Sequence, residues 1–169
     1  MEVLIRDVEL ADAEGLVGIL NPIIEARIYT ALDPTVTVDG ERDYIRHFSP
    51  RGVWKVALDA DAGRVVGFQI LEPFATYTRA FDHVATMGTY VDLALRRHGI
   101  AGRLFAATFD GARAKGYAKI LTFVRADNPA ALRAYLRHGF SVIGTASRQA
   151  RIDGRYIDEI LIEKWLADA

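Results

Sequence analysis

The sequence from 90 to 104 decides the fold, and it reads Tyr90-Val91-Asp92-Leu93-Ala94-Leu95-Arg96-Arg97-His98-Gly99-Ile100-Ala101-Gly102-Arg103-Leu104. A β-branched strand is followed by a basic turn and the start of a helix. The free amides and the dipole of a helix start favour an anion, and Gly99 and the small Ala101 allow the backbone to approach phosphate oxygens. Arg96, Arg97 and Arg103 add positive charge. On these residues alone, an anion-binding site and a purely structural bend fit equally well.

Composition restricts the class of protein. The 169 residues are 51% hydrophobic and 25% charged, which predicts one globular domain over 1–169. A formal net charge of -1 does not favour binding to nucleic acid or to an anionic membrane. The absence of cysteine excludes disulfides, thiolate metal sites and a covalent thioester intermediate on the protein. No stretch approaches ~18 apolar residues, so a soluble cytoplasmic protein is expected.

Hydrophobic periodicity predicts the element order β-α-α-β-β-β-α-β-α-β-β. In the first half, the expected elements are a strand at 3–8, a helix from about 12 that Pro22 should end or kink, an irregular stretch at 26–37, a helix from about 39, and a hairpin of strands 54–58 and 65–71. In the second half, they are a central strand at 83–93, a helix from 100 to 115, a strand at 120–124, and a helix from 129 to 139. The last expected element is a hairpin within 140–165 that turns at Asp153-Gly154. Helices alternate with strands in the second half, and hairpins lie elsewhere. This order favours a mixed sheet flanked by helices, in the α/β (α+β) class.

A second motif follows the strand at 120–124. Asn128 can cap a helix whose first residue, Pro129, loses no hydrogen bond there. The run Asn128-Pro129-Ala130-Ala131-Leu132-Arg133-Ala134-Tyr135-Leu136-Arg137-His138-Gly139-Phe140 resembles the N-x-x-A-x-x-x-Y-x-x-x-G-F segment of the GNAT acetyltransferases. Arg96-x-x-Gly99-x-Ala101 resembles the R/Q-x-x-G-x-G/A motif of the same superfamily. The chain has neither the G-x-G-x-x-G nor the P-loop pattern.

The resemblance extends over nearly the whole chain, and within the superfamily it is strongest to the phosphinothricin acetyltransferase group. It implies a GNAT fold, with a mixed, mostly antiparallel central sheet, and acetyl-CoA as co-substrate without a metal. It also implies coenzyme contacts from residues 90–92 and 96–103, Asn128 and Tyr135. The strand is expected to separate from its neighbour near Val91, whose backbone amide region would stabilise the oxyanion. The Tyr135 hydroxyl would face the thioester sulfur as general acid.

With no cysteine to carry the acyl group, direct transfer to the acceptor in a ternary complex is the economical mechanism. The phosphinothricin-type resemblance implies that the acceptor is a primary amine of a small molecule, such as an amino acid or its analogue. A possible homodimer is implied in the same way. Acetylation of a protein amine, and a non-catalytic acyl-CoA-binding module, are the alternatives.

The general base is the open question. The phosphinothricin-type group commonly has a glutamate where this chain has Thr86, which cannot act as a base at neutral pH. His83 has a suitable intrinsic pKa, but its odd spacing from Thr86 would place it on the opposite face of a strand. Thr86 is expected in the acceptor site together with Glu25, Tyr29 and Asp158. The last three are further candidates for the base, acting directly or through water, and an acceptor amine that arrives partly neutral would need only a water chain.

Other polar and aromatic residues have weaker assignments. The loop aromatics Phe74 and Tyr77 would either line an acceptor pocket or pack on the sheet. His47, His98 and His138 lack acidic or histidine partners at ligand spacing, so no metal site is expected. Glu159, Glu163 and Lys164 are expected to form a solvated edge of the last strand.

Overall fold

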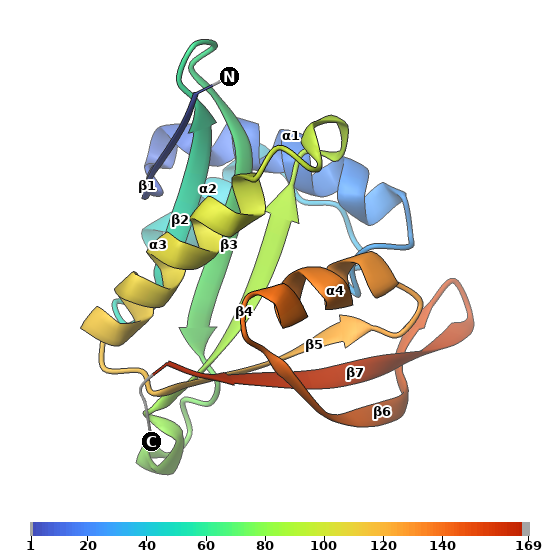
Figure 1. The fold of residues 1–169 in the computed structure, drawn as a ribbon. Coiled ribbons are helices and arrows are strands. Elements are labelled where there is room, and N and C mark those ends of the chain that lie inside the picture. Colours follow the sequence, from blue (N-terminus) through green and yellow to red (C-terminus); the bar gives the residue numbers. More distant parts are fainter. Residues whose placement is uncertain (1, 167–169) are drawn as a thin grey trace.

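The computed structural model describes residues 2–166, and within that range the strands form one seven-stranded sheet in the order β1-β2-β3-β4-β5-β7-β6 (Figure 1). The strands are β1 (Val3–Asp7), β2 (Val53–Asp59), β3 (Arg64–Pro73), β4 (Val84–Val91), β5 (Lys119–Arg125), β6 (Ser141–Ile152) and β7 (Arg155–Trp165). The α-helices are α1 (Ala13–Glu25), α2 (Val38–Arg46), α3 (Ile100–Ala114) and α4 (Pro129–Arg137). Neighbouring strands are antiparallel except β4 and β5, which are parallel. The predicted mixed, mostly antiparallel sheet flanked by helices is therefore confirmed.

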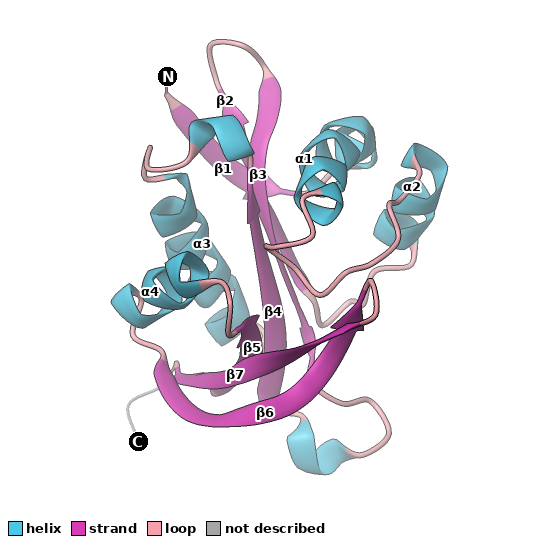
Figure 2. Ribbon diagram, turned by 90° about the vertical axis from the view of Figure 1, so that its right-hand side faces the viewer, coloured by secondary structure: helices cyan, strands magenta, loops and turns pink. Residues whose placement is uncertain are grey.

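The helices cover both faces of the sheet, with α1 and α2 on one side and α3 and α4 on the other (Figure 2). On the α1 side, Leu16 and Ile24 pack against Phe68 and Trp54. On the α3 and α4 side, Phe105 anchors a second cluster of buried side chains. Burial on both faces explains why the central strands are almost continuously apolar. No helix within residues 2–166 is long and apolar enough to span a membrane.

The predicted helix starts have the expected caps. The Asn128 side chain accepts a hydrogen bond from the Ala131 amide at 3.1 Å, and Pro129 occupies the first turn of α4. Gly99, at φ 74°, directly precedes α3. No atom lies within 4 Å of where a Cβ on Gly99 would stand, so its backbone conformation rather than lack of space favours glycine. The α4 helix ends at Arg137, slightly before the predicted end at Gly139.

Of the two effects predicted for Pro22, to end the first helix or to kink it, the first is wrong. The α1 helix continues to Glu25, and the Ala26 amide donates to the Pro22 carbonyl oxygen at 3.1 Å. Proline removes one helical donor, but the last turn carries Ile23 and Ile24, which are almost completely buried. Tertiary packing of that turn outweighs the local preference.

The strands β4 and β5 pair only at their beginnings, Val84 with Lys119 and Ala85 with Ile120. Beyond that point they diverge, and the Thr122 hydroxyl donates to the Met87 carbonyl oxygen at 2.8 Å across the opening. The expected separation of the central strand from its neighbour is therefore present. His83 lies outside β4, in the turn before it, where its carbonyl oxygen accepts from the Ala118 and Lys119 amides.

Candidate active site

A cleft of about 1070 Å³ opens where β4 and β5 diverge. It is bounded by the second halves of both strands, the turn before α3, the exposed side of α4 and the loop that follows α1. Such a volume suits a drug-sized or larger ligand. We call the part near α3 and α4 the donor half, and the part formed by loop 26–37, Arg125 and Glu159 the acceptor half.

The turn before α3 forms one wall of the donor half. Arg96, Arg97, Gly99, Ile100 and Ala101 all line the cleft. Both Arg97, at φ 69°, and Gly99 have left-handed backbone conformations. For an arginine this conformation is uncommon, and such strain is typical of functional turns. The turn thus presents two guanidinium groups and the amides of a helix start to the same space.

The α4 helix adds basic residues that sequence analysis missed. Arg133 and Arg137 lie one turn apart and line the cleft, followed by His138. Within residues 2–166, Arg96, Arg97, Arg133 and Arg137 form no ion pair. The i, i+4 spacing of these two arginines, on a helix capped by Asn128, is the sequence signal that could have identified them. The donor half therefore collects positive charge that no carboxylate of the described chain neutralises.

His138 contributes a flat surface rather than a charge. Its ring stacks on Phe105 with centroids 4.2 Å apart. Burial lowers the pKa of the imidazole, and the nearby Lys164 ammonium lowers it further. The ring is therefore neutral near pH 7.

Tyr135 lies at the bottom of the donor half and is 7% exposed. Its hydroxyl is 2.9 Å from the Thr89 hydroxyl, which accepts a hydrogen bond from the Gln69 side-chain amide at 2.9 Å. Burial raises the pKa of the phenol well above its usual value, and the hydrogen bond with Thr89 offsets this only in part. The phenol therefore keeps its proton and serves as a donor. Sequence analysis did not identify Thr89 or Gln69, because their contact with Tyr135 spans separate elements.

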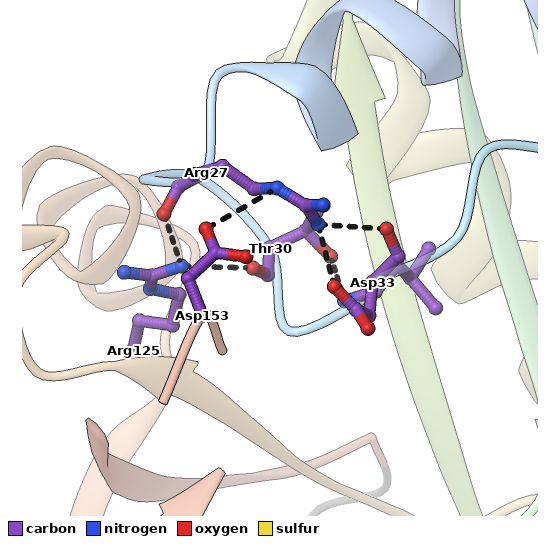
Figure 3. Close-up of polar contacts among 6 residues, drawn as sticks. Arg27, Thr30, Asp33, Arg125 and Asp153 are labelled. Carbon is purple, nitrogen blue, oxygen red and sulfur yellow. Dashed lines mark hydrogen bonds and ion pairs between the residues drawn. The ribbon is translucent and has the colours of Figure 1, made fainter. Parts of the chain in front are cut away.

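Residues of loop 26–37 line the acceptor half, and polar contacts hold this loop in place (Figure 3). The Arg125 guanidinium donates to the carbonyl oxygens of Arg27 at 2.7 Å and Thr30 at 3.0 Å. It also makes a bidentate pair with Asp127 at 2.8 and 2.7 Å. The Asn128 side chain donates to the Tyr29 carbonyl oxygen at 3.2 Å. The loop is thus fixed to the ends of β5 and to the cap of α4.

Two further contacts connect the loop to other parts of the site. Arg27 forms ion pairs with Asp33 at 2.6 Å and with Asp153, in the β6–β7 turn, at 3.6 Å (Figure 3). The Arg96 guanidinium lies over the Tyr29 ring, 4.0 Å from its centroid. Tyr29 therefore separates the basic turn of the donor half from the acceptor half.

Comparison with known proteins agrees with this geometry. Residues 24–140 match the model of the acetyltransferase (GNAT) family. The chain belongs to this family. The prediction of an acetyl-CoA-dependent acyltransferase is confirmed at that level, because GNAT proteins share this donor.

Individual GNAT relatives cover most of the chain. The YwnH protein of Bacillus subtilis, which is named as a phosphinothricin acetyltransferase, is 28% identical over 91% of this chain and 93% of its own. The structure of a GCN5-related N-acetyltransferase from Kribbella flavida is 26% identical, with a TM-score of 0.83 over 96% of this chain and 97% of the other. A phosphinothricin acetyltransferase from Sinorhizobium meliloti, solved with acetyl-CoA, is 19% identical, with a TM-score of 0.89 over 99% of this chain and 90% of the other. This last likeness supports the GNAT fold.

The GNAT cleft includes some of the predicted coenzyme residues and leaves others outside. Tyr90, Val91, Asn128 and Tyr135 line it together with the basic turn, whereas Asp92, His98, Gly102 and Arg103 do not. The Asp92 carboxylate accepts from the Ala94 amide and from Arg64. The His98 Nδ1 lies 3.0 Å from the Arg96 carbonyl oxygen, and Arg103 donates to the Val3 carbonyl oxygen at 3.1 Å. These groups shape the turn or tie it to β1.

Among the predicted acceptor residues, only Tyr29 and Thr86 line the cleft. Glu25 is exposed at the end of α1, and the Asp158 carboxylate accepts from the Arg148 amide at 2.7 Å. Phe74 and Tyr77 pack against Phe81 in the β3–β4 connection.

His83 is the last residue of that connection, directly before β4, whereas the cleft opens beyond Ala85. It is exposed and does not line the cleft, so the structure does not favour it as the base. Within residues 2–166, no group of three or more histidine, aspartate or glutamate side chains is arranged to hold a metal ion.

The expectation of a solvated edge at Glu159 is wrong. The last strand, β7, lies between β5 and β6 rather than at the edge of the sheet. Glu159 is 3% exposed and lines the acceptor half of the cleft. Burial raises the pKa of its carboxyl group, and the Arg125 guanidinium opposes this rise only in part. Farther along β7, Glu163 is paired with Lys119, and Lys164 lies over the Phe109 ring.

Proposed function

We propose that this protein transfers the acetyl group of acetyl-CoA to the primary amine of a small molecule by direct transfer in a ternary complex. The observation that carries the proposal is the division of one cleft into a basic half with a buried phenol and a second half that is lined by a fixed loop and an acidic residue. The first suits a phosphorylated thioester, and the second suits an ammonium group.

The donor half supports coenzyme binding. The amides at the start of α3 and the unpaired guanidinium groups of Arg96 and Arg97 would bind the pyrophosphate. Arg133 and Arg137 on α4 would add contacts to the phosphate-bearing end. The diverging edges of β4 and β5 leave backbone groups free to pair with the pantetheine arm, as donors and acceptors do in a strand.

The same cleft supports the chemistry of acyl transfer. The amine nitrogen attacks the thioester carbonyl carbon, and the backbone near Val91 would hold the developing oxyanion. When the carbon–sulfur bond breaks, the Tyr135 hydroxyl would donate toward the sulfur. Thr89 supports this orientation: if its hydroxyl donates to the phenol oxygen, the phenol hydrogen is left free to point into the cleft.

A small acceptor fits better than a protein segment. Loop 26–37 is held by Arg125, Asn128 and Arg27, and its residues line the acceptor half. A protein tail or lysine side chain would need a shallow, open groove at this position. The fixed loop beside Tyr29 narrows this part of the cleft and supports a small acceptor instead.

Thiol release from acetyl-CoA over a panel of small amines, amino acids and peptides tests the proposal. Turnover of one or more small amines, with little or none for peptides, is the expected result. Tight coenzyme binding in isothermal titration without turnover of any amine would contradict it and favour a non-catalytic binding module. Preference for peptides would favour a protein acetyltransferase.

A further inference from the structure

We propose that the Glu159 carboxylate binds the ammonium group of the acceptor and takes its proton before attack. This inference rests on the proposed function, because it concerns the second substrate of the same reaction. It assigns the base to β7, the strand on which Glu159 was expected from the sequence to be solvated.

Strand pairing determines the direction in which Glu159 points. In the antiparallel register of β5 and β7, Glu159 lies opposite Arg125. Directly opposed residues of antiparallel strands project from the same face of a sheet. The Arg125 side chain reaches the carbonyl oxygens of Arg27 and Thr30, so this face is the one covered by loop 26–37. Glu159 therefore lies beneath that loop, in the wall of the acceptor half.

The Glu159 carboxylate has no partner of its own. Within residues 2–166 it makes no hydrogen bond or ion pair, although the residue is 3% exposed and lines the cleft. The neighbouring cation, Arg125, directs its donors to Asp127 and to two loop carbonyls. A buried carboxylate without a partner is costly, and an ammonium group in the cleft would supply the missing contact.

Burial, rather than the neighbouring charges, makes Glu159 suited to act as a base. The residue opposite it on β6, Ala146, does not titrate, and on β5 it faces Arg125, whose positive charge opposes the rise in pKa only in part. On the covering loop, Arg27 is neutralised by Asp33 and Asp153. Burial raises the pKa of Glu159. A carboxylate with a raised pKa accepts a proton from an ammonium group more readily than an ordinary one does.

The protons of the reaction balance with Glu159, Tyr135 and solvent. The ammonium group gives one proton to Glu159, and the neutral amine forms the carbon–nitrogen bond. The second proton leaves the nitrogen when the carbon–sulfur bond breaks and ends on the coenzyme sulfur through the Tyr135 hydroxyl. Glu159 then releases its proton to solvent, and the products are the N-acetylated amine and the free thiol.

Glu72 is the competing acid. It lies opposite Thr86 in the β3–β4 register, on the same face. However, its carboxylate accepts a hydrogen bond from the Tyr44 hydroxyl at 2.8 Å, and it does not line the cleft. Burial and the absence of a partner favour Glu159.

The test compares Glu159→Gln, Glu159→Asp and Glu72→Gln with the wild type. Glutamine has the same shape as glutamate and removes a buried charge, so the first variant is expected to fold. It should lower kcat/KM by about 100-fold or more and flatten the acidic limb of its pH profile, with an unchanged coenzyme Kd. The aspartate variant should recover part of the activity. A matched control, Glu163→Gln on the same strand, should keep the wild-type pH profile.

Each outcome has a distinct meaning. If the wild type turns over an amine and Glu159→Gln keeps its kcat/KM and its acidic limb, the role of Glu159 is wrong while the proposed function stands. If only Glu72→Gln loses the acidic limb of the pH profile, the base is Glu72 on β3 rather than Glu159. If the wild type acetylates no amine, both the proposed function and this role fail. If the glutamine variant does not fold, Glu159→Leu, which removes the carboxylate and keeps an apolar side chain of similar size in the buried wall, replaces it, and wild-type kcat/KM and pH profile in that variant would overturn the assignment.

Discussion

The donor half of the cleft holds arginines that form no ion pair within residues 2–166, whereas Arg27 and Arg125 in the acceptor half are engaged by carboxylates and loop carbonyls. In the acceptor half it is an acid, Glu159, that makes no hydrogen bond or ion pair with any residue of the described range 2–166. A cleft with unpaired positive charge at one end and an unpaired carboxylate at the other is suited to an anionic donor and a cationic acceptor. The difference teaches that charge left unpaired in a folded chain indicates the charge of the ligand.

The buried phenol of the donor half, Tyr135, carries the largest expected effect. Tyr135→Phe removes the hydroxyl that would donate to the leaving sulfur and should lower kcat by about 100-fold. The coenzyme Kd should stay near that of the wild type, because the ring keeps its packing against Phe105. Steady-state kinetics and isothermal titration measure both. Thr89→Val should cause a smaller loss, and full activity in the phenylalanine variant would remove Tyr135 from the chemistry.

The basic turn should determine coenzyme affinity. Arg96→Ala removes a charged contact to the pyrophosphate and should weaken coenzyme binding by about 10- to 100-fold. Arg103→Ala is the matched control, since Arg103 is directed to the Val3 carbonyl oxygen outside the cleft. Titration of both variants with coenzyme A compares the loss of affinity caused by an arginine that lines the cleft with the loss caused by one that lies outside it. Equal weakening would mean that general positive charge, rather than the geometry of the cleft, holds the coenzyme.

The ion pairs of the loop should affect only the acceptor. Arg27→Ala breaks partly exposed pairs with Asp33 and Asp153, and such pairs contribute little each. The acceptor KM should therefore rise about threefold with little change in coenzyme Kd. Arg46→Ala, which removes an exposed pair with Asp43 on α2, serves as the control. An equal rise in KM for the control would show that the effect is not specific to the loop.

The smallest expected effect is a pH dependence of stability. The folded-state pKa of Glu159 is raised, so the folded chain binds its proton more tightly than the unfolded chain does. The free energy of unfolding should therefore fall as pH rises from the unfolded pKa through the folded pKa, and Glu159→Gln should remove that part of the slope. Urea unfolding of both proteins between pH 4 and about 8 measures it. Identical slopes would mean that the carboxylate is well solvated.

The framework of the donor half could be predicted from sequence because its signals are local, whereas Arg133, Arg137 and Thr89 were found only in the structure. The cap at Asn128, the proline after it and the glycine before α3 act within a few residues, and all lie where the sequence indicated. The acceptor half depends on contacts between distant segments. Only the insertion of β7 between β5 and β6 buries Glu159, and only the fold brings Arg125 to the loop after α1. Local rules likewise failed at Pro22, where burial of the last helical turn outweighs the missing donor.

The most direct test of the central claim is product analysis after incubation of the wild-type protein with acetyl-CoA and the amine panel. Mass spectrometry should find an N-acetylated small amine in equal amount to the free coenzyme thiol, with the mass of the protein unchanged. Thiol release without an acetylated amine, a stable acetyl group on the protein, or coenzyme binding with neither product would contradict direct transfer between the two halves of this cleft.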